Sequence, residues 1–191
     1  MSSPHLLSLP GVDFGTVRAQ VHEFVWRDGM HVVEVGSPQK VAPYSLAIEA
    51  ELPQHDRELA SGRLIVLHDP AGNDAWEGCY RCVSLTQADV DTAMAADPLL
   101  IDVGWTWLTD ALRHAGCTYT AESGTVTTIN GRGFGGLSDQ PDRAEIEIRC
   151  SWTPLFDGTP DLRPHLAAWQ ELLCIAAGLP PVGTPALGFV A

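Results

Sequence analysis

Residues 144–152 read Ala-Glu-Ile-Glu-Ile-Arg-Cys-Ser-Trp, a stretch in which apolar and polar side chains alternate strictly. Successive side chains of a strand point to opposite faces, so Ile146, Ile148 and Cys150 share one face and their polar neighbours share the other. Strands that are buried on one side only are typical of antiparallel sheets. The stretch therefore predicts an antiparallel sheet with one covered face and one face in water.

The same alternation recurs in residues 44–52. Further strands are predicted at residues 63–68, 76–85 and 118–129, the last being rich in threonine. Apolar residues at helical spacing predict helices at residues 13–26, 86–96, 98–115 and 164–176. The resulting order, α-βββ-αα-ββ-α, predicts an α+β fold. We expect a single antiparallel sheet of about five strands, with helices packed mainly on one face.

Local signals set the expected boundaries. Thr86, followed three residues later by Asp89, resembles a capping box and predicts a helix start. Asp97-Pro98 predicts another helix start, and Gly116 predicts the end of that helix. Residues 1–10 are expected to be a loose tail, residues 11–178 a single α+β domain, and residues 179–191 a Pro/Gly-rich tail.

Composition narrows the classes of function. Lys and Arg number 11 against 24 for Asp and Glu, which gives a formal net charge of −13. The electrostatic field of a strongly negative protein repels nucleic-acid phosphates and anionic membranes. We therefore expect no direct nucleic-acid binding and no membrane association. The five cysteines match no secreted disulfide framework, which favours reduced thiols and a cytoplasmic location. No cofactor is predicted.

The most interesting loop follows the strand at residues 63–68. His68 and Asp69 end that strand, and Asn73, Asp74 and Trp76 lie where the chain returns. An imidazole beside carboxylates is suited to acid–base chemistry or to ligand binding. The alternative is structural, because Asp, Pro, Gly and Asn are also the residues that a hairpin turn requires.

A second candidate is the glycine-rich loop at residues 131–136, with Gly133, Phe134, Gly135 and Gly136 as its mobile part. Its spacing does not match the dinucleotide fingerprint, and no helix is predicted after it. The loop is expected to be a mobile strand connection that could serve as a lid for a ligand.

Two further features are weaker. Cys79 and Cys82 have the spacing of half a zinc site, but no second pair exists and a strand would point them to opposite faces, so no metal is predicted. Trp105 lies off the apolar stripe of its predicted helix. An exposed tryptophan there would mark a partner surface.

Several short motifs carry a resemblance. They are Leu67-His68-Asp69-Pro70-Ala71-Gly72, Ala75-Trp76-Glu77-Gly78, Val103-Gly104-Trp105, Phe134-Gly135-Gly136, Ala144-Glu145-Ile146-Glu147-Ile148-Arg149 and Ser151-Trp152-Thr153-Pro154. From about residue 40 to residue 180, the chain resembles an actinobacterial family of uncharacterised proteins that share a domain of unknown function. The resemblance implies no activity. Members are often encoded beside a ribonuclease-D-like exonuclease, which implies a link to RNA metabolism.

Three hypotheses follow. The first is a non-catalytic protein-binding or adaptor module, expected to be a homodimer, because the sequence contains no catalytic signature. The second is a small hydrolase-like enzyme in which His68, Asp69 and Asp74 surround a pocket gated by the glycine loop. The third is an RNA-metabolism-associated factor, which rests on the implied gene neighbourhood alone.

Overall fold

The protein is described by a computed structural model, which covers residues 10–54 and 57–180. Its strands are β1 (His31–Val35), β2 (Tyr44–Gln54), β3 (Arg57–Asn73), β4 (Gly78–Asp89), β5 (Tyr119–Gly131) and β6 (Arg143–Pro154). Its helices are α1 (Pro10–Glu23), α2 (Thr92–Ala95), α3 (Leu99–His114) and α4 (Arg163–Ala176), with one 3-10 turn, η1 (Gly135–Leu137). Most of the two predicted tails lies outside the described residues.

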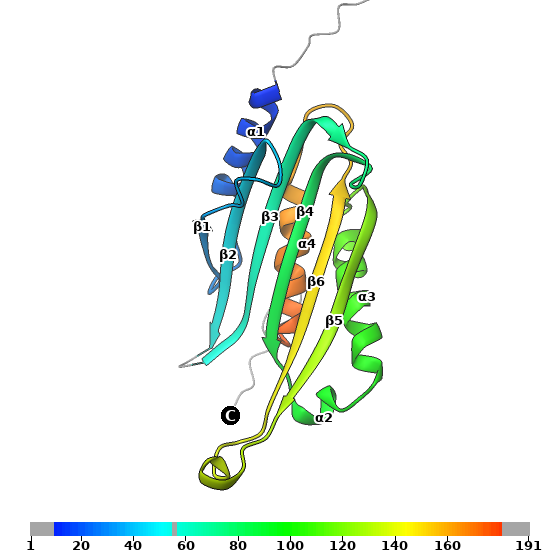
Figure 1. The fold of residues 1–191 in the computed structure, drawn as a ribbon. Helices are drawn as coiled ribbons and strands as arrows, with labels where there is room; N and C mark the ends of the chain where they lie inside the picture. Colours follow the sequence, from blue (N-terminus) through cyan, green and yellow to red (C-terminus); the bar gives the residue numbers. More distant parts are fainter. Residues whose placement is uncertain (1–9, 55–56, 181–191) are drawn as a thin grey trace, which may run out of the picture.

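All six strands form one sheet in the order β1-β2-β3-β4-β6-β5, and every neighbouring pair is antiparallel. Helices α1, α3 and α4 lie against one face of this sheet (Figure 1). The predicted α+β class, with one antiparallel sheet and helices on one face, is confirmed. The predicted count of about five strands is corrected to six, because β1 pairs along β2 from His31 to Val35.

The predicted helix start at Thr86 was wrong. Strand β4 continues to Asp89, and α2 begins only at Thr92, where Asp91 caps it by accepting a hydrogen bond from the Ala93 backbone N–H. Thr86 pairs with Ile148 of β6 and is fully buried. Pairing on both sides of β4 therefore outweighs the local capping signal.

The next helix boundaries follow the sequence. The Asp97 carboxylate accepts a hydrogen bond from the Leu99 N–H at 2.9 Å, so α3 begins where Asp97-Pro98 predicts. Gly116 has φ +70° just after α3, in the left-handed region that glycine adopts without a steric penalty. No described helix is long and apolar enough to cross a membrane, and α3, the longest, has 16 residues.

The core lies between the sheet and the helices, and two tryptophans dominate it. Trp152 on β6 and Trp169 on α4 are both fully buried. The Trp152 indole N–H donates to Nδ1 of His165 at 3.1 Å, and the Trp169 indole N–H donates to the Ser84 hydroxyl at 2.9 Å. Each buried indole thus has a partner for its polar atom, which avoids a desolvation penalty.

Two apolar residues of α3 face away from this core. Leu99 is 63% exposed and Val103 is 44% exposed. The buried face of α3 is instead formed by Leu100, Gly104, Leu108, Ala111 and Leu112. An exposed apolar pair on a helix needs a partner or remains an association-prone patch.

Candidate functional site

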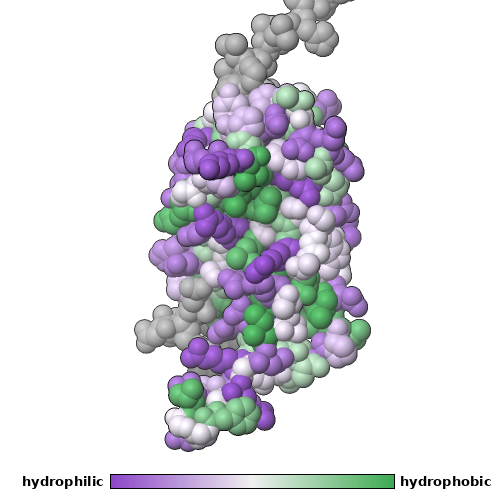
Figure 2. All heavy atoms as spheres, in the orientation of Figure 1, coloured by the Kyte–Doolittle hydropathy of each residue, from purple (hydrophilic) through white to green (hydrophobic). Residues whose placement is uncertain are grey.

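The face of the sheet opposite the helices is not covered by any described helix, and we call it the open face (Figure 1). Strand registers align its side chains in rows across the sheet. One row contains Val35, Ala47, Ile65, Val83, Ser151 and Ser123. The next row contains Val33, Glu49, Arg63, Leu85, Arg149 and Thr125. An apolar row thus lies directly beside a charged one, and Figure 2 shows hydrophobic and hydrophilic side chains interspersed on this face.

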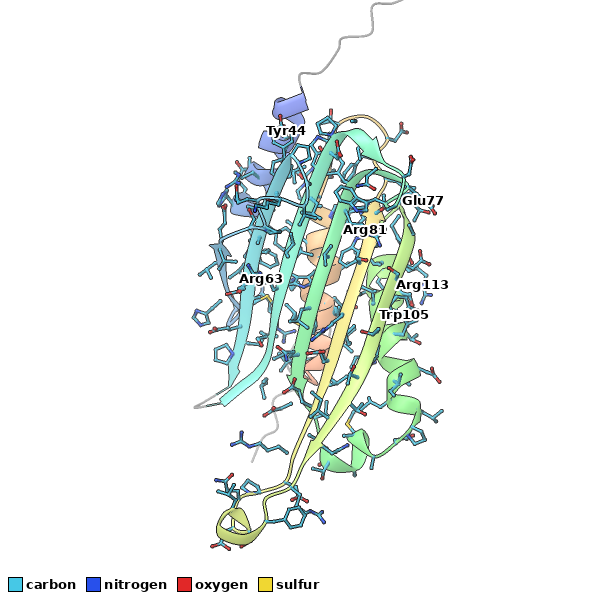
Figure 3. The ribbon with its side chains drawn as sticks, in the orientation of Figure 1. Tyr44, Arg63, Glu77, Arg81, Trp105 and Arg113 are labelled. Carbon is cyan, nitrogen blue, oxygen red and sulfur yellow. The ribbon has the colours of Figure 1, made fainter. Side chains whose placement is uncertain are left out.

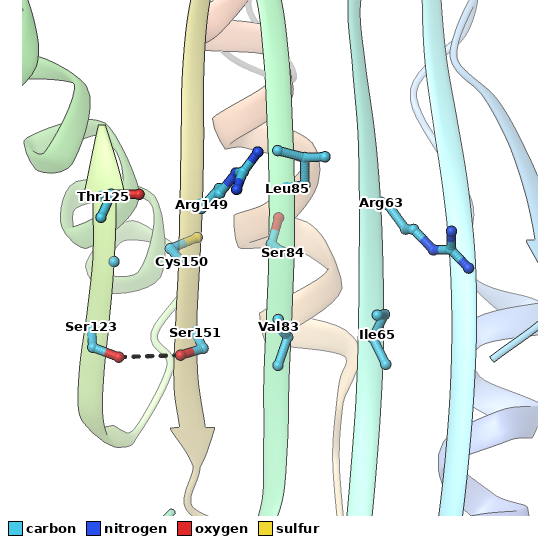
Figure 4. Close-up of a pocket in the computed structure, with 11 residues that line it drawn as sticks. Arg63, Ile65, Val83, Ser84, Leu85, Ser123, Thr125, Arg149, Cys150 and Ser151 are labelled. Atoms are coloured by element: carbon cyan, nitrogen blue, oxygen red, sulfur yellow. Dashed lines mark hydrogen bonds between the residues drawn. The ribbon is translucent and has the colours of Figure 1, made fainter. Parts of the chain in front are cut away.

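A cavity of about 500 Å³ lies on the middle of the open face (Figure 4). Its lining comprises Arg63, Ile65, Val83, Ser84, Leu85, Ser123, Gly124, Thr125, Arg149, Cys150 and Ser151. The centre is aliphatic, and hydroxyl groups line the side formed by β5 and β6. Such a mixture of apolar surface with a few polar groups is typical of binding sites.

Two arginines flank the aliphatic centre. Arg63 turns away toward β2, where its guanidinium donates to the Gly36 carbonyl at 2.7 Å and lies 3.4 Å from the Glu49 carboxylate. Arg149 lies on the other side of Leu85, and its Nε is 2.8 Å from a Glu147 carboxylate oxygen (Figure 4). The Arg149 side chain is 66% exposed, so it remains accessible to a ligand.

The segment between β1 and β2 folds back over one corner of the open face. Besides the bond from Arg63 to Gly36, the Ser45 hydroxyl donates to the Pro38 carbonyl at 3.0 Å. Ala47 and Leu67, which face this side, are buried. The accessible part of the open face is therefore the part that contains the cavity, over β3, β4, β6 and β5.

Arg81 of β4 joins three strands at one end of the cavity (Figure 3). Its Nη1 donates to the Ala121 carbonyl at 2.7 Å and to the Thr153 hydroxyl at 3.1 Å. Its Nη2 donates to the hydroxyls of Ser123 at 3.2 Å and Ser151 at 2.6 Å. Arg81 is only 7% exposed, and burial lowers the pKa of its guanidinium.

His68, the predicted centre of the loop site, faces the helix layer. It is 4% exposed and stacks on Tyr80, with ring centroids 4.1 Å apart. Its Nδ1 lies 3.1 Å from the Cys79 carbonyl oxygen. Because a carbonyl can only accept, Nδ1 carries a proton and donates it to this oxygen. Nε2 is buried and has no hydrogen-bond partner among the described residues.

The neighbouring polar residues form the turn between β3 and β4. The Asp69 carboxylate accepts from the Ala71 N–H, and the Asn73 side chain accepts from the Ala75 N–H, both at 3.0 Å. Asp74 is exposed, and Trp76 is partly buried. No hydrogen bond or ion pair between described residues joins His68 to Asp69 or Asp74. In the described part of the chain, these side chains bond within the turn and do not converge on His68 as the hydrolase hypothesis requires.

The glycine loop lies at the opposite end of the sheet. It connects β5 and β6, where Gly131 pairs with Arg143, whereas the turn after His68 connects β3 and β4 at the other end (Figure 1). The Arg132 guanidinium binds both carboxylate oxygens of Asp142 and closes the base of the loop. Phe134 is 76% exposed, and Gly133, Gly135 and Gly136 surround it. The loop cannot gate a pocket at His68.

Trp105 is partly buried rather than fully exposed. A Cβ atom placed on Gly124 of β5 would lie 2.8 Å from the Trp105 ring. The tryptophan therefore packs against β5, beside the sheet (Figure 3). The exposed aromatic that the sequence suggested as a partner surface is not found at this position.

Cys79 and Cys82 lie on β4, and their side chains point to opposite faces. We expect iodoacetamide to alkylate exposed Cys79 first at about pH 8, because thiolate formation and access control reactivity. Burial raises the pKa of Cys82, and it raises the pKa values of Cys117 and Cys150 to about 12. Peptide mapping of the native protein checks this order, and the denatured protein, in which all five thiols are accessible, is the control. Equal labelling of Cys79 and Cys82 in the native protein would contradict it.

Sequence reasoning missed the cavity. Its polar residues come from four strands, and along the chain the arginines appear singly, with no cluster of basic residues. The available signal was the polar face of each alternating strand, which carries Arg63, Arg81, Arg149 and Ser151. Only the strand registers bring these side chains together.

A family model described as "Protein of unknown function (DUF3000)" matches residues 11–185. No curated protein and no solved structure matches the chain.

Proposed function

The chain belongs to the DUF3000 family, and because the description of that family assigns no activity, we propose a function from the geometry of the chain itself. The protein is a non-catalytic binding module that holds a segment of a protein partner on the open face of its sheet. The observation that carries this proposal is the cavity of about 500 Å³ on the one sheet face that no described helix covers.

The composition of the cavity supports a protein partner. Ile65, Val83 and Leu85 form an apolar centre, and Arg149 and the hydroxyls form a polar rim. Protein interfaces have this anatomy, with a desolvated apolar core inside a polar boundary. Arginine is also enriched among the residues that contribute most to binding energy.

The chemistry of the rim favours binding over catalysis. A serine hydroxyl becomes a nucleophile when a neighbouring base removes its proton. Ser123 and Ser151 instead accept hydrogen bonds from Arg81, and a guanidinium stays protonated and cannot act as that base. The lining residues include no histidine, aspartate or glutamate.

Site-directed photocrosslinking tests the proposal. Benzoylphenylalanine replaces Val83 in the cavity, and in a control protein it replaces Val25, which is 88% exposed outside the sheet. In extract of the native host, we expect a discrete polypeptide adduct from position 83, none from position 25, and loss of the adduct when Leu85→Asp is added. Equal adducts from both positions, or no adduct from position 83, would overturn it.

We also infer that the module is a homodimer, joined through the edge strand β5. This strand pairs on one side only, with β6. Natural edge strands are usually protected by charged residues or proline, yet residues 123–131 contain neither. Ile129 on β5 and Ile101 on neighbouring α3 are 47% and 44% exposed. Pairing of two β5 strands would reduce the exposure of Ile129 on the open face and of Ile101 on the helix side, and it would place both cavities on one continuous face.

Sedimentation velocity checks the dimer. We expect Ile129→Arg to raise the dimer dissociation constant at least about tenfold, since a charge in an apolar interface costs more than roughly 1.4 kcal/mol. Leu155→Arg is the matched control, because Leu155 is 41% exposed and lies beyond the end of β6. A wild-type protein that is monomeric at every concentration reached would refute the inferred dimer.

A further inference from the structure

The Arg81 guanidinium is a buried cation without a carboxylate partner. Its two Nη atoms make four hydrogen bonds, and all four acceptors are neutral: the Ala121 carbonyl and the hydroxyls of Thr153, Ser123 and Ser151. No ion pair joins Arg81 to a carboxylate within the described part of the chain. The Glu77 carboxylate acts on Arg81 only through space and makes no ion pair with it, so the guanidinium has no carboxylate bonded to it directly.

Two serine hydroxyls connect the Arg81 guanidinium to the cavity by hydrogen bonds. Ser123 Oγ and Ser151 Oγ both accept from Arg81 Nη2, and they lie 3.2 Å apart. Each hydroxyl has one hydrogen atom. One of the two can donate to the other, but the second hydroxyl hydrogen then has no acceptor among the described residues. Hydrogen bonds to a cation polarise a hydroxyl and make it a stronger donor.

The free donor lies in the cavity, because Ser123 and Ser151 both line it (Figure 4). The strand registers place Val83 and Ile65 next to Ser151 in the same row. Arg149 is in the adjacent row, with an exposed guanidinium. A ligand atom at the serine pair therefore has one hydroxyl donor, a nearby accessible cation and aliphatic surface on one side.

We propose that the partner segment carries an aspartate or glutamate whose carboxylate binds the Ser123–Ser151 hydroxyl pair, with a neighbouring apolar side chain over Val83 and Ile65. This inference rests on the proposed function, and it names the chemistry that the open face recognises. A carboxylate here would be bonded to the hydroxyls that Arg81 holds, and its second oxygen can accept from an Arg149 nitrogen other than the Nε that pairs with Glu147. Three of the 11 basic residues, Arg63, Arg81 and Arg149, lie on this face, where Arg63 pairs with Glu49 and Arg149 pairs with Glu147.

The test uses a designed peptide as probe, acetyl-Ser-Val-Glu-Leu-Ser-amide, with the matched peptide that has Gln in place of Glu. Both are titrated into isotope-labelled protein and followed by NMR, including the Arg81 side-chain resonances. We expect the Glu peptide to bind at least about tenfold more tightly, because a hydrogen bond to a charged acceptor is stronger than one to a neutral amide. Equal binding of the two peptides, or binding of neither, would overturn the inference.

Variants separate recognition from a structural role. The double variant Ser123→Ala and Ser151→Ala should lose the preference for Glu over Gln, while Thr127→Val should retain it, since Thr127 lies on the same strand and face but makes no bond to Arg81. Preference that survives in the double variant would refute the assignment. Hexanoate is the third probe: if it binds as tightly as the Glu peptide, the ligand is a small acid and not a protein segment.

The two proposals fail in different ways. If crosslinking from position 83 succeeds but no carboxylate preference is found, the open face is a binding surface of other chemistry. If the carboxylate preference is found but no polypeptide adduct forms, the subsite stands and its ligand is not a protein in the extract.

Discussion

Replacement of Trp169 by alanine is expected to lower the free energy of unfolding by about 3–5 kcal/mol, the usual cost of truncating a large buried aromatic residue. The Trp169 side chain is fully buried between α4 and the sheet. It contacts Trp26 edge-on, with ring centroids 5.8 Å apart, and its indole N–H donates to Ser84. Gly62 of β3 allows this close approach, because a Cβ there would lie 3.2 Å from the Trp169 ring.

Urea unfolding monitored by far-ultraviolet circular dichroism measures this loss. Trp169→Phe should cost less, since it keeps an aromatic ring but removes the donor to Ser84. Trp107→Ala on α3 is the matched control, because Trp107 is only partly buried and should lose clearly less stability. Equal losses for the two alanine variants would mean that Trp169 is not a centre of the core.

Acidification is expected to destabilise the protein through His165. Burial lowers the pKa of this imidazole from 6.5 to about 4. The unfolded chain therefore binds the proton first as the pH falls, so the contribution of neutral His165 is fully present above pH 6.5 and is lost progressively between pH 6.5 and 4. The total loss from this group is about 3 kcal/mol, at 1.36 kcal/mol for each pKa unit.

Stability curves against pH check the sign and the range. His165→Gln removes the titrating group while leaving an acceptor that can serve the Trp152 indole, so its curve should be flatter from pH 6.5 to 4. His22→Gln is the control, because His22 lies exposed on α1 and pairs with Glu34. Subtracting the stability curve of a variant from that of the wild type cancels the contribution of the carboxylates, because these titrate in every variant. Parallel curves for wild type and His165→Gln would contradict the assignment.

The strands that alternate most strictly were predictable because one local rule decides them. In residues 144–152 the apolar set faces the core, with Ile146 and Ile148 fully buried. In residues 44–52 the same is true of Leu46 and Ile48. A period of two fixes which face is buried without reference to the rest of the chain.

Other elements depend on contacts that are distant in sequence. Thr86 carries a capping signal, but β3 and β6 lie on either side of it and extend β4 through it. Leu99 and Val103 fit a helical stripe, yet the sheet sets the rotation of α3 and leaves both exposed. A local sequence pattern indicates whether a segment is a helix or a strand. Tertiary packing decides which of its faces is buried and where it ends.

The candidate site shows the same division. The turn interpretation of Asp69 and Asn73 was available from residue type, and both side chains accept backbone hydrogen bonds in that turn. The cavity was not available, because Arg81, Ser123 and Ser151 come from different strands and only β6 pairing brings them together. These side chains meet only because of the register between neighbouring strands. The alternation within one strand does not specify that register.

Isothermal titration calorimetry with the polypeptide recovered by crosslinking tests the central claim, that the open face is the binding surface. The titration compares wild type, Leu85→Asp in the cavity and Val25→Asp outside it, where Val25 is 88% exposed. The account predicts that Leu85→Asp weakens binding at least roughly 30-fold, the effect of losing about 2 kcal/mol at an interface centre, and that Val25→Asp changes nothing. Wild-type affinity in Leu85→Asp, or equal weakening in both variants, would contradict it.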